Sequence, residues 1–88
     1  MVQLPQDEME PVINRLRRAQ GQIGGVLKLI EAGRDCEDVV TQLAAVSRAL
    51  DKAGFAIIAS GLKVCLSEPD GAESLDSKKM AKLFMSLA

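Results

Sequence analysis

The sequence predicts an all-α fold with three helices, and three observations carry this prediction. Apolar residues recur at steps of three and four along two long segments, about residues 7–32 and 36–66, as on the buried face of a helix. A shorter segment with helical character follows at about residues 73–87. No stretch shows the alternation of apolar and polar residues that is typical of strands. The 88 residues, 1–88, are predicted to form a single domain.

The first predicted helix is amphipathic over residues 7–32. Pro11 lies near its start, where the missing amide of a proline is tolerated, and Gly33 is placed to end it in a left-handed conformation. The apolar stripe advances in alternating steps of four and three and consists of Val12, Leu16, Ala19, Ile23, Val26 and Ile30. These steps predict one continuous helix with a heptad-like seam.

The second predicted helix, residues 36–66, carries two apolar stripes and is therefore expected to bury more than one side. Asp35 is placed to cap its first turn, and the turn-forming residues 67–71 end it. The first stripe is Cys36, Val39, Leu43, Val46, Leu50, Ala53 and Ile57, and the second is Val40, Ser47, Gly54, Ile58, Gly61 and Cys65. Gly54 and Gly61 each cost about 1 kcal/mol relative to alanine, so close packing against a partner must offset them.

The third predicted helix, residues 73–87, follows a capping-box-like pair, Asp70 and Glu73. Two helices of the predicted lengths would extend about 40 to 45 Å, which is longer than a compact chain of this size is wide. A lone hairpin of them would leave apolar surface in water. We therefore expect the second helix to pair antiparallel with its own copy in a two-fold homodimer.

Composition excludes several function classes. The chain has no histidine, which removes imidazole metal sites and histidine acid–base or triad chemistry. It also lacks a Cys-x-x-Cys pair and a glycine-rich phosphate loop, so no enzyme activity is predicted. Eleven basic and twelve acidic residues nearly cancel to a net charge of −1, and any anion-binding surface must come from local clustering.

The composition also predicts the cellular compartment of the protein. Two cysteines do not make the disulfide framework of a small secreted domain, and the first residues lack the order of a signal peptide. Charged residues interrupt every apolar run before it reaches the roughly 18 positions of a membrane span. We expect a cytoplasmic protein without a membrane partner.

The two cysteines, Cys36 and Cys65, are 29 positions apart in the sequence. On one helix their α-carbons would lie about 44 Å apart, whereas a disulfide needs roughly 7 Å or less. In an antiparallel pair with its axis between Leu50 and Asp51, however, Cys36 faces Cys65 of the partner subunit, which makes two dithiol sites per dimer. The alternative is that both are small, buried apolar residues.

A local basic cluster is the second candidate site. Arg15, Arg18 and Gln22 recur at helical spacing on one face of the first helix, beside Arg17, and Arg48 and Lys52 belong to the second helix. The cluster is either a solvated helix flank or a surface that contacts the phosphates of double-stranded DNA, repeated by symmetry in an oligomer. Without a recognisable helix-turn-helix or zinc finger, DNA binding would depend on phosphate contacts and groove shape.

Three segments carry a family resemblance: NRLRRAQGQI at 14–23, GRDC at 33–36 and QLAAV at 42–46, together with Cys65. They resemble the copper-sensing repressor (CsoR/RcnR) family of bacterial regulators over about residues 10–85. The resemblance implies an antiparallel dimer of three-helix protomers, a homotetramer built as a dimer of dimers, and operator DNA that is released by an inducer. It also implies that Arg15, Arg18 and Lys52 face DNA and that Cys36 with Cys65 of the partner subunit is the sensor.

The sequence departs from the copper sensors of that family at three positions. Gly61 occupies the place of a histidine ligand, and Asp35 and Ala81 replace the tyrosine and glutamate that are expected to support the site. Two cysteines without a histidine resemble the persulfide-sensing (CstR) branch most. That resemblance implies a sensor of reactive sulfur species, persulfide or polysulfide, that requires no cofactor.

In this interpretation Cys36, at a helix start where backbone amides favour an anion, attacks the outer sulfur and becomes a persulfide. Cys65 of the partner subunit resolves it into a di-, tri- or tetrasulfide, which releases DNA. The alternative is a Cu(I)-responsive repressor in which Cys36 and Cys65 are metal ligands, because two thiolates can hold soft Cu(I). A further alternative is a helical interaction module with structural cysteines.

Overall fold

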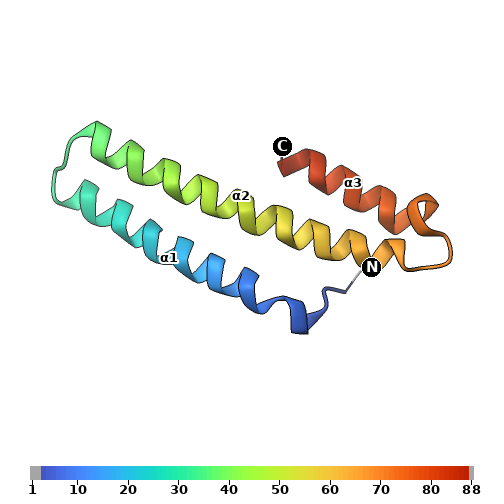
Figure 1. The fold of residues 1–88 in the computed structure, drawn as a ribbon. Coiled ribbons are helices and arrows are strands. Elements are labelled where there is room, and N and C mark those ends of the chain that lie inside the picture. The colour runs from blue at the N-terminus through green and yellow to red at the C-terminus, as the bar shows by residue number, and fades with distance from the viewer. Residues whose placement is uncertain (1–2, 88) are drawn as a thin grey trace.

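The computed structural model describes residues 3–87, apart from the side chain of Ala72, and within this range it is helical with no strand. Three α-helices follow one another: α1 (Glu10–Glu31), α2 (Cys36–Leu66) and α3 (Leu75–Leu87). The helices α1 and α2 form a long hairpin, and α3 folds back along the C-terminal half of α2 (Figure 1). The prediction of an all-α, three-helix protomer is confirmed.

The bounds of α2 agree with the predicted 36–66, whereas α1 and α3 begin later than predicted. The chain first makes a short 3-10 turn, η1 (Gln6–Glu8), so the first α-helix begins at Glu10 rather than at residue 7. A second 3-10 turn, η2 (Gly71–Glu73), delays the start of α3 from residue 73 to Leu75. Each of these tighter turns satisfies backbone groups that the longer predicted helices would have used.

The turn between the two long helices follows the predicted residues. Gly33 has a φ of +69°, and its amide donates to the carbonyl of Ile30 at 3.0 Å. The amide of Arg34 donates to the carbonyl of Leu29 at 3.0 Å, which completes a Schellman motif. At the start of α2, the carboxylate of Asp35 accepts from an amide of the first turn at 3.0 Å, so the predicted cap is confirmed.

The cap of α3 differs from the prediction. The side chain of Asp70 makes no capping hydrogen bond, so the expected capping-box-like pair with Glu73 is wrong. Instead the hydroxyl of Ser74 accepts from the amide of Ser77 at 3.0 Å. The 3-10 turn η2 includes Gly71–Glu73, so the extended residue directly before the helix is Ser74.

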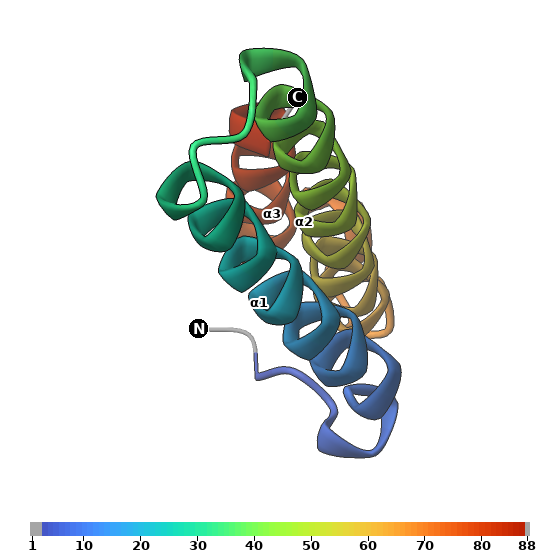
Figure 2. The same ribbon diagram turned by 90° about the vertical axis from the view of Figure 1, so that its left-hand side faces the viewer.

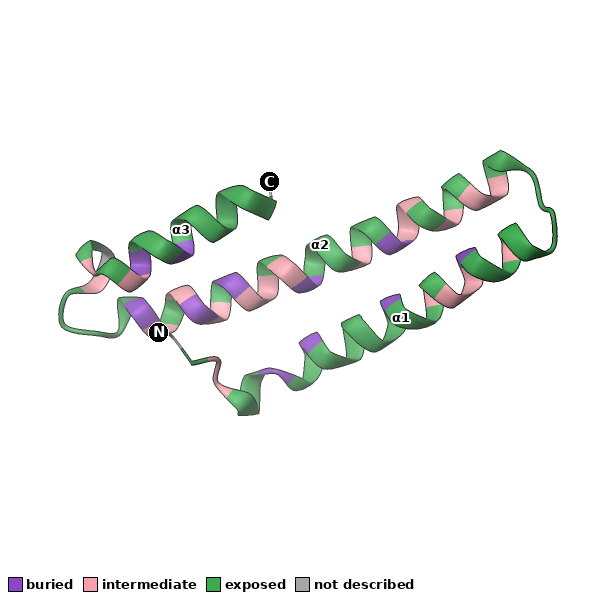
Figure 3. Cartoon of the chain, turned by 180° about the vertical axis from the view of Figure 1, so that it is seen from behind, coloured by how far each residue is buried: buried purple, intermediate pink, exposed green. Residues whose placement is uncertain are grey.

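The hairpin buries only half of each predicted stripe. Every seventh residue of α1, Val12, Ala19 and Val26, is buried against α2, but Leu16, Ile23 and Ile30 remain 39–57% exposed. Along α2, Val46 and Ala53 are buried while Leu43 and Leu50 remain about half exposed. Figure 3 shows short buried stretches separated by exposed ones along both long helices. In this hairpin the contact between α1 and α2 therefore covers one row of each stripe and leaves the other row exposed.

The opposite side of α2 packs against α3, which confirms that this helix buries more than one side. Gly54 and Gly61 face α3 at this contact. A Cβ atom at Gly54 would lie 2.9 Å from Leu87 Cδ1, and one at Gly61 would lie 2.8 Å from Met80 Cε. The two glycines therefore make room for side chains of α3, and this packing offsets their intrinsic cost in a helix.

The protomer is an elongated rod. Its extents are 56 × 25 × 15 Å, and its radius of gyration of 16.8 Å exceeds the roughly 12 Å of a compact chain of this length. Figure 2 shows the two long helices side by side over most of their length, with α3 farther from the viewer. The expected apolar surface is thus exposed, and the homodimer that would cover it stays a prediction. Within residues 3–87, no helix has the length and apolar character needed to cross a membrane.

Candidate functional site

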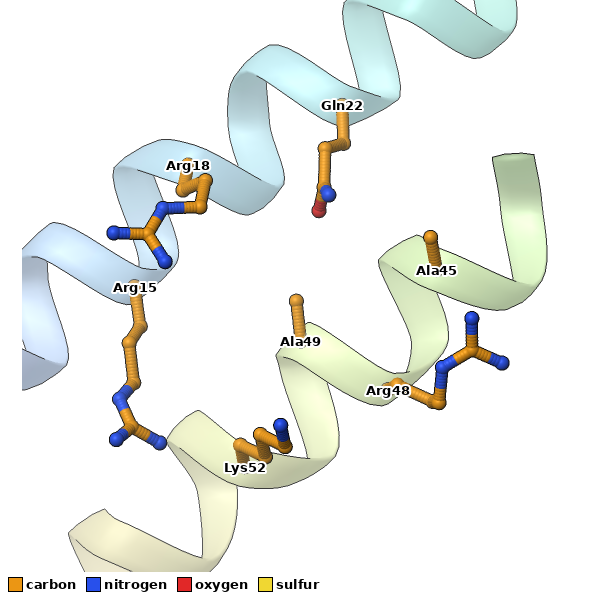
Figure 4. Close-up of a pocket in the computed structure, with 7 residues that line it drawn as sticks. All are labelled: Arg15, Arg18, Gln22, Ala45, Arg48, Ala49 and Lys52. Carbon is orange, nitrogen blue, oxygen red and sulfur yellow. The ribbon is translucent and has the colours of Figure 1, made fainter. Parts of the chain in front are cut away.

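A groove of about 320 Å³ lies between α1 and α2, and we call it the basic groove. Its lining residues are Arg15, Arg18 and Gln22 from α1 and Ala45, Arg48, Ala49 and Lys52 from α2 (Figure 4). The α1 residues share a face because they are three and four positions apart. The two alanines have short side chains, so they leave space between the longer basic side chains, and this space is the groove.

The basic groove carries positive charge without an internal counter-charge. Four of its lining side chains are cationic and none is acidic. Among residues 3–87, the ion pairs join Arg34 to Asp38 and Lys63 to Glu8, so none involves the groove. Gln22 Oε1 is buried there and has no hydrogen-bond partner within the described part of the chain. Free guanidinium groups beside an amide can bind the oxygens of a phosphate.

The structure thus brings together five of the six residues predicted to face DNA. Arg17 is the exception, because it is exposed on α1 but does not line the basic groove. Ala45 and Ala49 also line the groove, although neither belongs to the residues predicted from the sequence. Their signal was the spacing of two small residues four positions apart, flanking Arg48 on one helical face.

The two cysteines differ in exposure and lie near opposite ends of α2. Cys36 is the first residue of the helix and is exposed, whereas Cys65 is only 1% exposed. The alternative in which both are buried apolar residues therefore fails for Cys36 in the protomer. They are 29 positions apart on one helix, which separates their α-carbons by about 44 Å, so one protomer cannot join them. Their pairing across two subunits stays a prediction.

Cys65 belongs to a buried cluster and also lines a second groove. The cluster consists of Ile58, Cys65 and Met80, with Leu62 packed against it. The second groove, of about 480 Å³, has three carboxylates and no basic residue in its lining, and we call it the acidic groove: Gln3, Val64, Cys65, Glu68, Pro69, Asp70, Ser74 and Asp76. Within residues 3–87, no three Cys, Asp or Glu side chains converge on a shared metal position in one protomer.

A basic groove between two helices and a thiol near each end of the second helix define the class: a small helical protein with a cationic surface and two separate thiols. Residues 8–87 match the model of the family described as metal-sensitive transcriptional repressor. The chain therefore belongs to this family, the CsoR/RcnR family that its sequence resembles. Members of the family are transcriptional repressors, so the prediction that the chain is not an enzyme is confirmed.

Three relatives illustrate the similarity. The copper-sensing transcriptional repressor CsoR of Mycobacterium ulcerans is 33% identical over 61 residues, which cover 69% of this chain and 52% of that protein. The copper-sensing repressor RicR of Mycobacterium tuberculosis is 35% identical over 66 residues, covering 73% and 69%. The copper-sensing repressor CsoR of Bacillus subtilis is 28% identical over 61 residues, covering 69% and 60%.

The chain spans about half the length of the first of these relatives. No solved structure matches the chain significantly. The names of the three relatives refer to copper, and the matches do not distinguish the persulfide-sensing branch of the family.

Proposed function

We propose that the protein represses transcription by binding double-stranded operator DNA in the cytoplasm through the basic groove. The observation that supports this most is the convergence of Arg15, Arg18, Arg48 and Lys52 from two helices without an acidic neighbour in the groove. Phosphate contacts of this kind supply most of the affinity of a DNA-binding surface and fix its position on the duplex. In a homodimer or homotetramer the groove would be repeated by symmetry, so several grooves would follow one duplex.

Substitution of single groove residues tests this proposal. Arg18→Ala and Lys52→Ala should each weaken operator binding and reduce the slope of log affinity against log salt by about one, as expected when one phosphate contact is lost. Fluorescence anisotropy with a labelled operator fragment at several salt concentrations measures both quantities. Lys82→Ala on α3 removes the same charge from an exposed position outside the groove and is the control.

Equal losses of operator affinity in the groove variants and in Lys82→Ala would contradict the proposal. DNA binding would then depend only on the net charge of the protein and not on the groove. Arg17→Ala adds a finer comparison, since Arg17 belongs to the predicted DNA-facing set but lies outside the groove. We expect its effect to be smaller than that of Arg18→Ala.

The proposed sensor is the pair formed by Cys36 and Cys65 of the partner subunit in an antiparallel dimer. Because the two cysteines lie near the two ends of α2, each would lie at an end of the proposed dimer, where a link would join the helices of two chains. Such a link changes how protomers pack and thereby the spacing of the basic grooves. This couples the thiol site to DNA affinity.

Cu(I) is the inducer that the comparisons favour. The family is metal-sensitive, and the three relatives described above are named copper-sensing. The donor chemistry of this chain fits, because thiolates are ligands that select Cu(I). Bound Cu(I) would supply bonds from both subunits at once, and Cys36 and the partner's Cys65 would be the residues that hold it.

Reactive sulfur is the second candidate, and it is favoured by the absence of histidine from the chain. The exposed Cys36 thiolate would attack the outer sulfur of a persulfide and release the donor as a thiol. The partner's Cys65 would then attack the Cys36 sulfur and displace hydrosulfide, leaving a disulfide. If Cys36 carries a longer sulfur chain, attack of the partner's Cys65 on the sulfur next to the terminal one displaces hydrosulfide and leaves a tri- or tetrasulfide.

A parallel challenge of the reduced protein separates the two inducers. One sample receives one equivalent of Cu(I) per protomer, and the other receives an organic persulfide, both without oxygen. The copper proposal predicts DNA release by Cu(I) with no covalent link between chains, measured by anisotropy and denaturing intact mass. If only the persulfide releases DNA, and the chains become covalently linked, the inducer is reactive sulfur and the copper proposal is wrong. No response to either inducer, together with no DNA affinity in the parent protein, would support the helical interaction module with structural cysteines.

A further inference from the structure

We propose that the thioether of Met80 is a third soft donor to Cu(I) at the thiol site, beside Cys65. This proposal rests on the proposed copper response and assigns it a ligand from α3. The thiol pair alone offers two donors, and the whole sequence contains no histidine that could add a nitrogen. Thioethers share with thiolates the soft character that selects Cu(I).

Met80 is buried with Cys65 on the same side of α2. Met80 is 7% exposed and Cys65 is 1% exposed, and both belong to the buried cluster that also contains Ile58. Helix α3 brings Met80 there because it runs back along the C-terminal half of α2 (Figure 1). Cys65 forms no disulfide within the described part of the chain, so its sulfur is available as a ligand.

Gly61 determines where the thioether lies. A Cβ atom at this position would be 3.5 Å from Met80 Sδ and 2.8 Å from Met80 Cε, so the side chain of Met80 occupies the space that any larger residue would need. Gly61 precedes Cys65 by one helical turn, and side chains four positions apart point to the same face with Cβ atoms about 5–6 Å apart. Because Gly61 has no side chain, the Met80 sulfur can lie against the face of α2 that also carries Cys65.

The other described methionines do not share this position. Met9 is buried in a different cluster with Val12 and Ala53, and Met85 is 69% exposed on α3. Packing alone explains the Met9 cluster, which contains no other sulfur. The juxtaposition of a thioether, a free thiol and a glycine that makes room for the thioether is specific to the contact between α2 and α3.

The acidic groove offers a route for a cation to this site. Cys65 belongs to the groove lining as well as to the buried cluster, and Glu68, Asp70 and Asp76 line the same groove. A surface lined by charges of one sign raises the local concentration of the opposite ion. Cu(I) would be attracted to this entrance, whereas anionic sulfur donors would be repelled by it.

Removal of the Met80 sulfur at nearly constant volume tests the proposal. In Met80→Leu we expect the Cu(I) affinity, measured anaerobically by competition with a colorimetric Cu(I) chelator, to fall by at least about 10-fold, because even the loss of a residue that only supports a ligand costs this much. X-ray absorption should show three sulfur neighbours around copper in the parent protein and two in the variant. The control is Met9→Leu, a buried methionine in the other cluster, with affinity and sulfur count unchanged.

Gly61→Ala is the second variant, because its added methyl displaces the thioether while keeping the sulfur in the chain. We expect a loss of Cu(I) affinity here too, with circular dichroism confirming that both variants fold. If Met80→Leu retains the parent affinity and three sulfur neighbours, the Met80 proposal is overturned while the copper response stands. If the parent protein does not bind Cu(I) in the chelator competition, the copper response fails and the Met80 proposal fails with it.

Discussion

The two thiols occupy very different surroundings although they belong to one helix. Cys36 is exposed at the first position of α2, where its neighbours include the ion pair between Arg34 and Asp38 at 2.8 Å. Cys65 is enclosed by side chains of α2 and α3. A reagent can reach the first directly, whereas the second is only 1% exposed and is approached only through the acidic groove that it lines.

At the residue scale, this difference predicts the order of alkylation. The reduced protein treated with a limiting amount of iodoacetamide should be modified at Cys36 before Cys65, because the exposed thiol needs no opening of the fold. Peptide mass spectrometry over time measures both rates. In urea the two rates should become similar, since unfolding exposes both thiols. Faster modification of Cys65 under native conditions would contradict the assigned burial.

Several residue-level features were predictable because they depend only on near neighbours in the chain. Gly33 is needed for the left-handed turn, and Asp35 caps α2 as expected. Ser74 was not predicted as the cap of α3, since the preceding 3-10 turn shifts the helix start. The shift depends on how residues 67–74 cross from α2 to α3, and that path is set by packing.

At the element scale, the cap of α2 is the local contact most open to test. Asp35→Ala removes the carboxylate that accepts from the amide of Asp38 and should lower the free energy of unfolding by about 1 kcal/mol. Urea unfolding followed by circular dichroism measures the change. Asp70→Ala is the matched control, because the side chain of Asp70 makes no capping hydrogen bond. If Asp70→Ala lowers the free energy of unfolding as much as Asp35→Ala does, the effect comes from the loss of charge and not from the loss of the cap.

The packing of α3 shows why two glycines occur inside a long helix. Met80 and Leu87 occupy the spaces that side chains at Gly61 and Gly54 would need. Phe55 and Phe84 add an aromatic contact between the same helices, with ring centroids 5.4 Å apart. The sequence predicted that these glycines need close packing, but it could not identify the partner, because the contacts join positions far apart in the chain.

At the scale of the whole molecule, the uncovered half of the heptad seam predicts self-association. Leu16, Ile23 and Ile30 of α1 and Leu43 and Leu50 of α2 stay partly exposed in a rod 56 Å long. Rows of exposed apolar residues are typical of surfaces that bind another protein. Pairing of two such hairpins would cover the second row and place Leu50 beside the proposed two-fold axis.

Leu50→Glu should therefore disrupt the dimer. Two glutamates would meet near the axis, and the buried leucine contact, worth about 1.5 to 3 kcal/mol per side chain, would be lost. The dimer dissociation constant should rise by at least about 100-fold, as measured by sedimentation equilibrium. Leu75→Glu is the control, because Leu75 is 76% exposed at the start of α3, outside these rows. A monomeric parent protein would contradict the predicted dimer directly.

The sequence by itself determined the helical class, the bounds of α2, the turn at Gly33 and the basic character of residues 15–22, because these follow from periodicity and from contacts between near neighbours. Only the tertiary structure decided which half of each apolar stripe is buried, that Arg17 lies outside the basic groove, and that Met80 lies in the space above Gly61 beside Cys65. Those outcomes depend on how the helices rotate and slide against one another. A helix pattern specifies a face but not the partner that covers it, so the site is assembled only when α1 and α3 pack against α2.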